Sequence, residues 1–211
     1  MSIFVQPQQT LNIRTNAELA QIVCVDVAQL PTLQTGDLIF ASGEALLSKV
    51  IQQLTDSAWS HLGVVIRLGD ELLVLDCYAL TGARLVPFDT FIGKHATLSG
   101  YAGLLAVVRY ADVDATQRKA IQQFAMQQVG LGFAYSGLLV VAYRMWQNKP
   151  MLPDVSTMQM PQPHKTRLLC SELAYACFAH AGIALQVDQR GFISPASIWQ
   201  SEQLYLLGRV R

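Results

Sequence analysis

The sequence predicts an α+β fold in which an antiparallel sheet packs against helices, and two observations carry this prediction. The strand-like runs pair with their neighbours along the chain, most clearly where two β-rich runs flank a turn at Gly69-Asp70. Helical patterns lie before and after these runs, and they do not alternate with every strand as in a parallel βαβ fold.

The chain has 211 residues, of which 52% are hydrophobic and 14% are charged, and its formal net charge is zero. This length fits one domain with a substantial core. The charged fraction lies well below the usual quarter, so we expect a protein that buries much of its surface, contacts lipid peripherally or self-associates. The balanced charge argues against nucleic acid as a partner.

Neither a membrane span nor an export signal is expected. The most apolar run, "SGLLVVAYRMW" at 136–146, contains Arg144 and is shorter than the roughly 18 residues that a span needs. The first residues, "MSIFVQPQQTLNIR", lack a basic region followed by an apolar core. We therefore expect a cytoplasmic protein with reduced thiols.

The first elements after an N-terminal extension, residues 1–34, are a strand and a helix. A turn at Gly36-Asp37 leads into a buried strand from Leu38 to Ala41. The following stretch, "SGEALLSKVIQQLT", has apolar residues at helical spacing.

The hairpin around residues 69 and 70 brings a histidine close to an acid. If the loop has two residues, Leu68 pairs with Glu71. His61 and Asp76 are then diagonal neighbours on one face, at a spacing that long side chains span, whereas a shift by one residue would separate them. The expected result is an orienting His–Asp pair; the alternative is that Asp76 is a strand-end acid that meets water.

The remaining elements are strands and helices separated by turns. One strand ends at Pro87, and "YAGLLAVVRY" is a second. An amphipathic helix that stops at Gly130 follows, with one side formed by Ile121, Phe124, Ala125, Gln128 and Val129. The other expected features are a short apolar helix at about 136–146, a proline- and methionine-rich loop at 147–165, a helix from Cys170 to Gly182, a turn at Ser194-Pro195 and a final strand.

Cys170 stands at the expected start of its helix. A thiol in this position faces unpaired backbone N–H groups and the positive end of the helix dipole, which favour the thiolate. The alternative is a buried stripe of Cys170, Leu173, Ala174 and Cys177 on an ordinary helix. Cys24, Cys77 and Cys177 lack this setting, and we expect them to be buried and unreactive.

A nucleophilic cysteine needs a histidine, and His61 is the best candidate of the four. It opens an apolar strand, where a polar side chain needs a partner. His180 lies at the far end of the Cys170 helix, and His95 and His164 lie in polar or proline-rich stretches that suggest solvent exposure.

Taken together, these motifs resemble the circularly permuted members of the NlpC/P60-like branch of the papain fold, the YiiX/YebB type, which is related to the lecithin:retinol acyltransferase group. The matching segments are "GDLIF" at 36–40, "SHLGVV" at 60–65, Asp76, "CSEL" at 170–173 and "PASI" at 195–198. The order histidine, acid, cysteine is the permuted one, and the resemblance covers most of residues 35–205. Tyr135 is followed here by serine where the family often has aspartate, and Asp76 stands where glutamate is common.

The resemblance implies a permuted papain-like domain over 35–211, with 147–165 as an insertion that we expect to act as a flap over Cys170. It implies a thiol hydrolase of the amidase or peptidase type with Cys170 as nucleophile, His61 as base and Asp76 as orienting acid. Further expected substrate-binding residues are Tyr135, Ser60 and Trp59. No metal or organic cofactor is required, and the expected substrate is a peptide or an acylated small molecule. The alternatives are a lipid acyl hydrolase or acyltransferase, and a non-catalytic binding domain that kept the fold.

Overall fold

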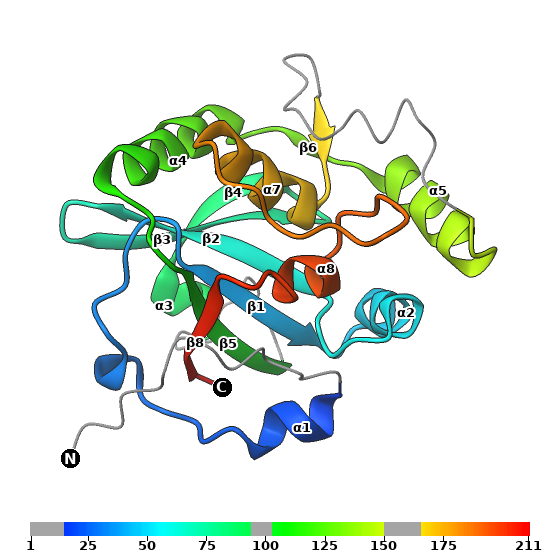
Figure 1. Cartoon of the computed structure of the whole chain (residues 1–211), viewed down its shortest axis with the longest axis horizontal. Coiled ribbons are helices and arrows are strands. Elements are labelled where there is room, and N and C mark those ends of the chain that lie inside the picture. Colours follow the sequence, from blue (N-terminus) through cyan, green and yellow to red (C-terminus); the bar gives the residue numbers. More distant parts are fainter. Residues whose placement is uncertain (1–14, 94–102, 150–165) are drawn as a thin grey trace.

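An antiparallel sheet of six strands, in the order β4-β3-β2-β1-β5-β8, forms the centre of the molecule (Figure 1). The computed structural model describes residues 15–93, 103–149 and 166–211. The strands of this sheet are β1 (Leu38–Gly43), β2 (His61–Leu68), β3 (Glu71–Tyr78), β4 (Gly82–Pro87), β5 (Gly103–Tyr110) and β8 (Leu204–Arg209). The predicted α+β class with an antiparallel sheet is confirmed.

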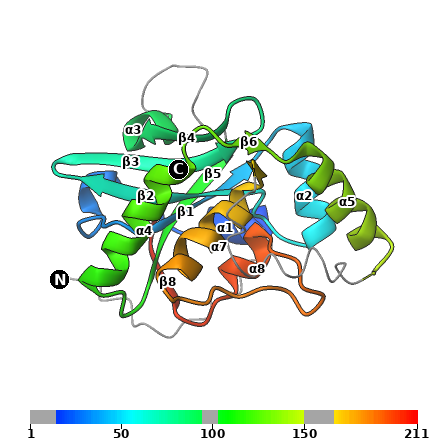
Figure 2. The ribbon, with the colours of Figure 1, turned by 90° about the horizontal axis from the view of Figure 1, so that it is seen from above.

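Helices cover both faces of the sheet. The described helices are α1 (Asn16–Gln21), the 3-10 turn η1 (Val27–Gln29), α2 (Leu46–Thr55), α3 (Phe88–Phe91), α4 (Ala115–Gln128), α5 (Tyr135–Trp146), α7 (Cys170–His180) and α8 (Pro195–Trp199). Seen from above, α4, α7 and α8 lie on one side of the sheet and α3 on the other (Figure 2). A short parallel pair, β6 (Gly132–Phe133) and β7 (Arg167–Leu168), joins the ends of α5 and α7.

Alternate side chains along the strands pack into two separate hydrophobic cores, one on each face of the sheet. On β1, Leu38 and Phe40 enter the core beneath α4, α7 and α8, whereas Ile39 and Ala41 enter the core beneath α3. This period of two is the pleat of a strand that is buried on both faces. Helix α7 lies against β2 and β3 of the sheet and buries Leu173, Ala174, Cys177 and Phe178 there.

The predicted register of the hairpin is confirmed. Leu68 pairs with Glu71 and Val64 pairs with Leu75, so the loop between the strands has two residues. Its first residue, Gly69, has φ +59°, a left-handed conformation that glycine adopts without strain.

The helix over residues 115–128 differs from its prediction at one end. Ile121, Phe124 and Ala125 are buried as expected, but Val129 is 46% exposed. Val129 is the C-cap, with φ −59° and ψ 130°, so the chain leaves the helix before this residue can extend the apolar stripe.

Several expectations lie partly or wholly outside the described residues. Of the 147–165 loop, only 147–149 is described, so the expected flap stays a prediction. His95 and His164 also lie outside the described ranges. Across the described parts of the chain, no helix has both the length and the apolar character that a membrane crossing requires.

Candidate active site

His61 and Asp76 meet on one face of the β2–β3 hairpin, as their register dictates. The imidazole Nε2 lies 3.2 Å from Asp76 Oδ2, and the two residues are 4% and 1% exposed. Between them on β2, Gly63 has no room for a side chain, because a Cβ there would lie 2.4 Å from a methyl carbon of Val74. The hairpin therefore holds the imidazole in one orientation, with Nδ1 left for another partner.

Arg84 is the second partner of Asp76, and sequence reasoning missed it. It stands directly opposite Asp76 on β4. Its Nε donates to Oδ1 at 2.8 Å and its Nη2 to Oδ2 at 3.3 Å, while its guanidinium lies 4.4 Å from the ring centre of Tyr78. The sequence contains a pattern that predicts this pair: if β3 and β4 form a hairpin, the register that the turn between them sets places Arg84 opposite Asp76.

The carboxyl of Asp76 stays ionised in this setting. Burial by itself would raise its pKa, but the hydrogen bonds and positive charges of His61 and Arg84 bring the pKa below the ordinary value. The side chain is therefore an acceptor that fixes His61 and a buried anion that favours the imidazolium.

Cys170 is the first residue of α7 and is partly buried. Two hydrogen bonds fix this helix start: Leu169 N–H donates to Glu172 Oε2 at 2.9 Å, and the Ser171 hydroxyl donates to the Ile193 carbonyl at 2.9 Å. The thiol thus lies at the positive end of the helix dipole, beside backbone N–H groups that have no partner within the helix.

The thiol of Cys170 lies close enough to the His61 imidazole to shift its pKa, which links the thiol to the buried pair. Burial lowers the pKa of His61, but the negative charge of an ionised Cys170 and the contacts with Asp76 outweigh it and raise the pKa to about 9. The surroundings of His61 therefore favour its protonated form.

The other cysteines divide into two groups. Cys77 and Cys177 are fully buried, and burial raises the pKa of each to about 12. Cys24, in contrast, is exposed, so the prediction that it is buried is wrong. It makes an isolated bridge with Arg209 of the outer strand β8.

An apolar groove, partly open to solvent, runs from Cys170 between α2 and α5. Figures 1 and 2 both place α2 and α5 side by side at one end of the molecule. The lining residues near the nucleophile are Ser60, Leu169, Ser171, Ile193, Ser194 and Pro195. The lining residues farther along are Ile51, Leu54, Thr55, Phe133, Leu138, Val141, Ala142 and Met145.

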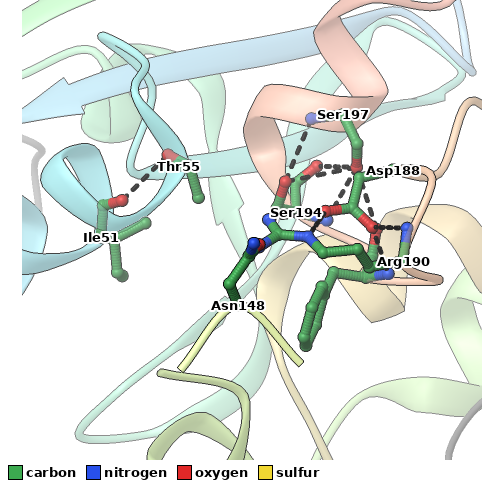
Figure 3. A network of polar contacts seen from close by, with 8 residues as sticks. Ile51, Thr55, Asn148, Asp188, Arg190, Ser194 and Ser197 are labelled. Atoms are coloured by element: carbon green, nitrogen blue, oxygen red, sulfur yellow. Dashed lines mark hydrogen bonds and ion pairs between the residues drawn. The ribbon is translucent and has the colours of Figure 1, made fainter. Parts of the chain in front are cut away.

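A polar network anchors the loop that forms one wall of this groove (Figure 3). Asp188 binds Arg190 at 3.0 Å, and Arg190 Nη1 donates to Asn148 Oδ1 at 3.2 Å, just beyond the end of α5. Ser194 caps α8 by accepting from Ser197 N–H at 3.0 Å. These contacts tie the 188–194 loop to both α5 and α8.

The three predicted substrate-binding residues have different positions. Ser60 lines the groove next to His61. Tyr135 is 49% exposed and packs edge-on against Phe133, while its hydroxyl donates to the Ala79 carbonyl. Trp59 is fully buried, so direct substrate contact by its ring is wrong: the ring packs in the core against Phe40 and Trp199.

The described side chains do not fit a metal centre. Nowhere in the described ranges do three or more histidine, cysteine, aspartate or glutamate side chains gather closely enough to hold a metal ion.

Comparison with known proteins identifies the family to which this chain belongs. A family model described as "Permuted papain-like amidase enzyme, YaeF/YiiX, C92 family" matches residues 32–137, half of the chain, including His61 and Asp76. The curated protein named "Probable lipoprotein peptidase YaeF" from Escherichia coli K12 is 29% identical over 184 residues, which cover 80% of this chain. The match spans only 63% of that longer protein.

The fold is also that of a solved structure titled as metalloprotein yiiX from Escherichia coli O157:H7. The two chains share 18% identity with a TM-score of 0.61, and the match covers 83% of this chain and 97% of the other. This likeness concerns the fold alone, and it agrees with the family match. The expected resemblance to permuted papain-like proteins is confirmed, and the chain belongs to the YaeF/YiiX family of permuted papain-like amidases, family C92.

Proposed function

We propose that this chain is a cysteine-dependent hydrolase of the amidase or peptidase type that acts through Cys170, His61 and Asp76. The observation that carries the proposal is the continuous contact from thiol to imidazole to carboxylate, with the thiol at a helix start and at the end of a groove. A purely structural cysteine on α7 would not need a buried, ionised partner, and Cys177 on the same helix has none.

The first half of the reaction forms an acyl-enzyme. His61 takes the thiol proton, and the Cys170 sulfur attacks the substrate carbonyl carbon. The Cys170 backbone N–H, at the positive end of α7, stabilises the oxyanion that forms. The bond from carbon to the leaving nitrogen then breaks, and the leaving amine departs with the proton from His61. The acyl group remains on Cys170 as a thioester.

The second half returns the free enzyme. His61 removes a proton from a water molecule, whose oxygen attacks the thioester carbonyl. The carbon–sulfur bond breaks, the carboxylic acid leaves, and Cys170 regains its proton from His61. Throughout, Asp76 keeps the imidazole in the productive orientation, because it is itself fixed by Arg84.

Alkylation of the native protein with iodoacetamide across pH, read by mass spectrometry, tests the proposal. An activated Cys170 is labelled well below about pH 8, and His61→Ala removes this low-pH labelling. The exposed Cys24 is the internal comparison for an ordinary thiol, and the buried Cys77 and Cys177 should stay unlabelled. Equal pH profiles for Cys170 and Cys24 would contradict the proposal.

A second candidate function, lipid acyl hydrolysis or acyl transfer, is favoured by the apolar lining of the groove. It uses the same acyl-enzyme and differs in the substrate and in the acceptor, which is water for a hydrolase and another nucleophile for a transferase. Adding an amine or alcohol to a preformed acyl-enzyme, and measuring the fraction of product that is not the free acid, separates the two.

A further inference from the structure

We propose that the outward faces of α2 and α5 form a docking surface on which the protein lies peripherally against an anionic lipid bilayer. This α2–α5 surface consists of Leu46, Leu47 and Val50 of α2 and of Leu139, Val140, Tyr143 and Trp146 of α5. None of these side chains belongs to the candidate site, so the inference goes beyond the proposed function and does not depend on it.

Exposed apolar side chains gather on α2 and α5. In the described parts of the chain, twelve large hydrophobic residues are at least 40% exposed, and eight of them belong to these two helices. Leu46 and Trp146 are the most exposed of the eight, at 83% and 75%. Because the two helices lie side by side at one end of the molecule (Figures 1 and 2), these side chains form a patch of the kind that marks an interaction site.

The apolar face of α2 points away from the protein. Gln52 is the buried residue of this helix, and its amide nitrogen donates to the Ala58 carbonyl at 2.9 Å. At about 100° per residue, Leu46, Leu47 and Val50 lie on the opposite side of the helix from Gln52. The fold therefore directs leucine and valine to positions where a helix that faces water carries polar residues.

Helix α4 shows how the same fold treats a helix that does face water. It buries its apolar stripe against the sheet, and its exposed positions include Lys119, Gln123 and Gln127. The outward positions of α5 beyond its first turn are apolar instead, among them Leu139 and Tyr143. The two helices lie at opposite ends of the molecule in both ribbon views, so this difference is local to the α2–α5 end.

The charges of the α2–α5 surface fit an anionic partner. Each helix carries one charged side chain, Lys49 on α2 and Arg144 on α5, and Lys149 follows α5, so all three charges are positive. Glu44 precedes α2 and Asp56 is its C-cap, so both acids lie outside the helix. A second copy of this chain on the same surface would bring like charges together, whereas an anionic headgroup layer is complementary to them.

The aromatic residues of this surface favour lipid over a protein partner. Tyr143 and Trp146 lie next to the basic end of α5, with their ring centres 6.4 Å apart. Tyrosine and tryptophan prefer the headgroup level of a bilayer, while aliphatic side chains such as Leu139 and Val140 enter the acyl region. Helices of this composition lie in the plane of the interface with their apolar faces about 5–10 Å deep.

Trp146 gives a direct measurement of lipid contact. The chain has three tryptophans, of which Trp59 and Trp199 are buried and Trp146 is exposed. The full chain is mixed with vesicles of phosphatidylcholine, with or without phosphatidylglycerol, and a parallel set carries bromine on the acyl chains. Binding should shift the tryptophan emission to shorter wavelength and allow quenching by bromine, most strongly with phosphatidylglycerol present. Trp146→Phe should remove both signals.

Variants with matched controls test which residues make the surface. Leu46→Gln combined with Leu139→Gln should weaken cosedimentation with anionic vesicles by at least about tenfold. Val23→Gln combined with Met126→Gln replaces two exposed apolar residues elsewhere and should leave binding unchanged. Lys149→Gln should weaken binding to anionic vesicles by about fivefold and leave binding to phosphatidylcholine alone unchanged. If the first double variant does not fold, the Lys149→Gln comparison decides.

The outcomes separate this inference from its rivals and from the proposed function. Absence of cosedimentation with both vesicle compositions, or equal losses in the two double variants, would overturn the docking surface. Sedimentation velocity without lipid tests a second copy: a dimer that Leu46→Gln/Leu139→Gln converts to monomer would assign the surface to self-association. Alkylation of Cys170 is measured without lipid, so failure of vesicle binding leaves the proposed function standing, and loss of Cys170 reactivity leaves this surface standing.

Discussion

Two buried aspartate–arginine pairs lie in the same sheet, and only one of them belongs to the candidate site. Asp37 binds Arg109 through two bonds, with Nε to Oδ1 at 2.7 Å and Nη2 to Oδ2 at 2.8 Å. Arg84 binds Asp76 in the same bidentate way, with Nε to Oδ1 at 2.8 Å and Nη2 to Oδ2 at 3.3 Å. Both carboxylate side chains have no exposed surface.

The third partner makes the difference between the pairs. Asp37 Oδ2 accepts from the backbone N–H of Gln34 at 2.7 Å, so its pair closes the turn before β1. Asp76 instead accepts from the imidazole of His61, which in turn reaches Cys170. A buried ion pair is thus structural or functional according to the further partner that its Oδ2 accepts from, in addition to the arginine. It also explains the aspartate of "GDLIF" as a folding residue.

The largest expected effect comes from replacing each acid by its amide. Asp76→Asn should lower kcat/KM for an activated aliphatic ester by about 10³-fold to 10⁴-fold, because the amide stabilises the wrong tautomer of the histidine. Asp37→Asn should leave kcat/KM per folded molecule within about threefold, since its carboxylate touches no site residue. Steady-state kinetics on protein quantified by active-site alkylation makes the measurement. If Asp76→Asn lowers kcat/KM by less than about tenfold, Asp76 does not orient His61 in the reaction.

Removing the cation of each pair should cost stability in both cases. Arg84→Met and Arg109→Met each leave a buried carboxylate without its main partner, and we expect each to lower the free energy of unfolding by about 3 kcal/mol. Urea titrations followed by tryptophan fluorescence give the values. The two variants should differ in chemistry, because only Arg84→Met loosens the acid that orients His61. Equal alkylation profiles of Cys170 in both would argue against that link.

The pH dependence should report the raised pKa of His61. Because the protonated imidazole delivers a proton to the leaving group, kcat/KM should fall above about pH 9, by about tenfold per pH unit. The ordinary value is 6.5, so protonated His61 contributes stability that is complete below that pH and is lost as the pH rises to about 9. Asp76→Asn should move the alkaline limb to lower pH, since the carboxylate raises this pKa. An unchanged limb would assign it to another group.

The central geometry of the site could be predicted from the sequence because it is local. A two-residue turn and strict strand alternation fix the register of the hairpin, and this register alone brings His61 to Asp76. Cys170 could be recognised by its place at a helix start, which depends only on the pattern around it.

The remaining features depend on contacts that no local pattern contains. Arg84 pairs with Asp76 across a third strand, and Arg109 meets Asp37 from β5, far along the chain. Trp59 is predicted as a substrate-binding residue, but it is buried in the core against the rings of Phe40 and Trp199. Cys24 is predicted to be buried, yet it lies beside the edge strand β8 with its side chain exposed.

The smallest expected effect concerns a third ion pair, Asp188–Arg190, in which the side chains are 23% and 32% exposed (Figure 3). Water competes with this pair, so Arg190→Gln should cost about 1 kcal/mol or less, even though the guanidinium also contacts Asn148 and the Phe192 ring. Its cost should shrink between about 0.05 and 0.5 M NaCl because salt screens exposed charges.

The buried pairs should respond differently to the same change of salt. The cost of Arg109→Met should stay nearly constant between the two salt concentrations, because no solvent reaches the Asp37 carboxylate that it leaves behind. Urea titrations of both variants at each concentration make the comparison. If Arg190→Gln lowers the free energy of unfolding as much as Arg109→Met does, and with as little dependence on salt, solvent exposure does not explain how strongly these ion pairs stabilise the fold. The 188–194 wall of the groove would then be as rigidly held as the sheet.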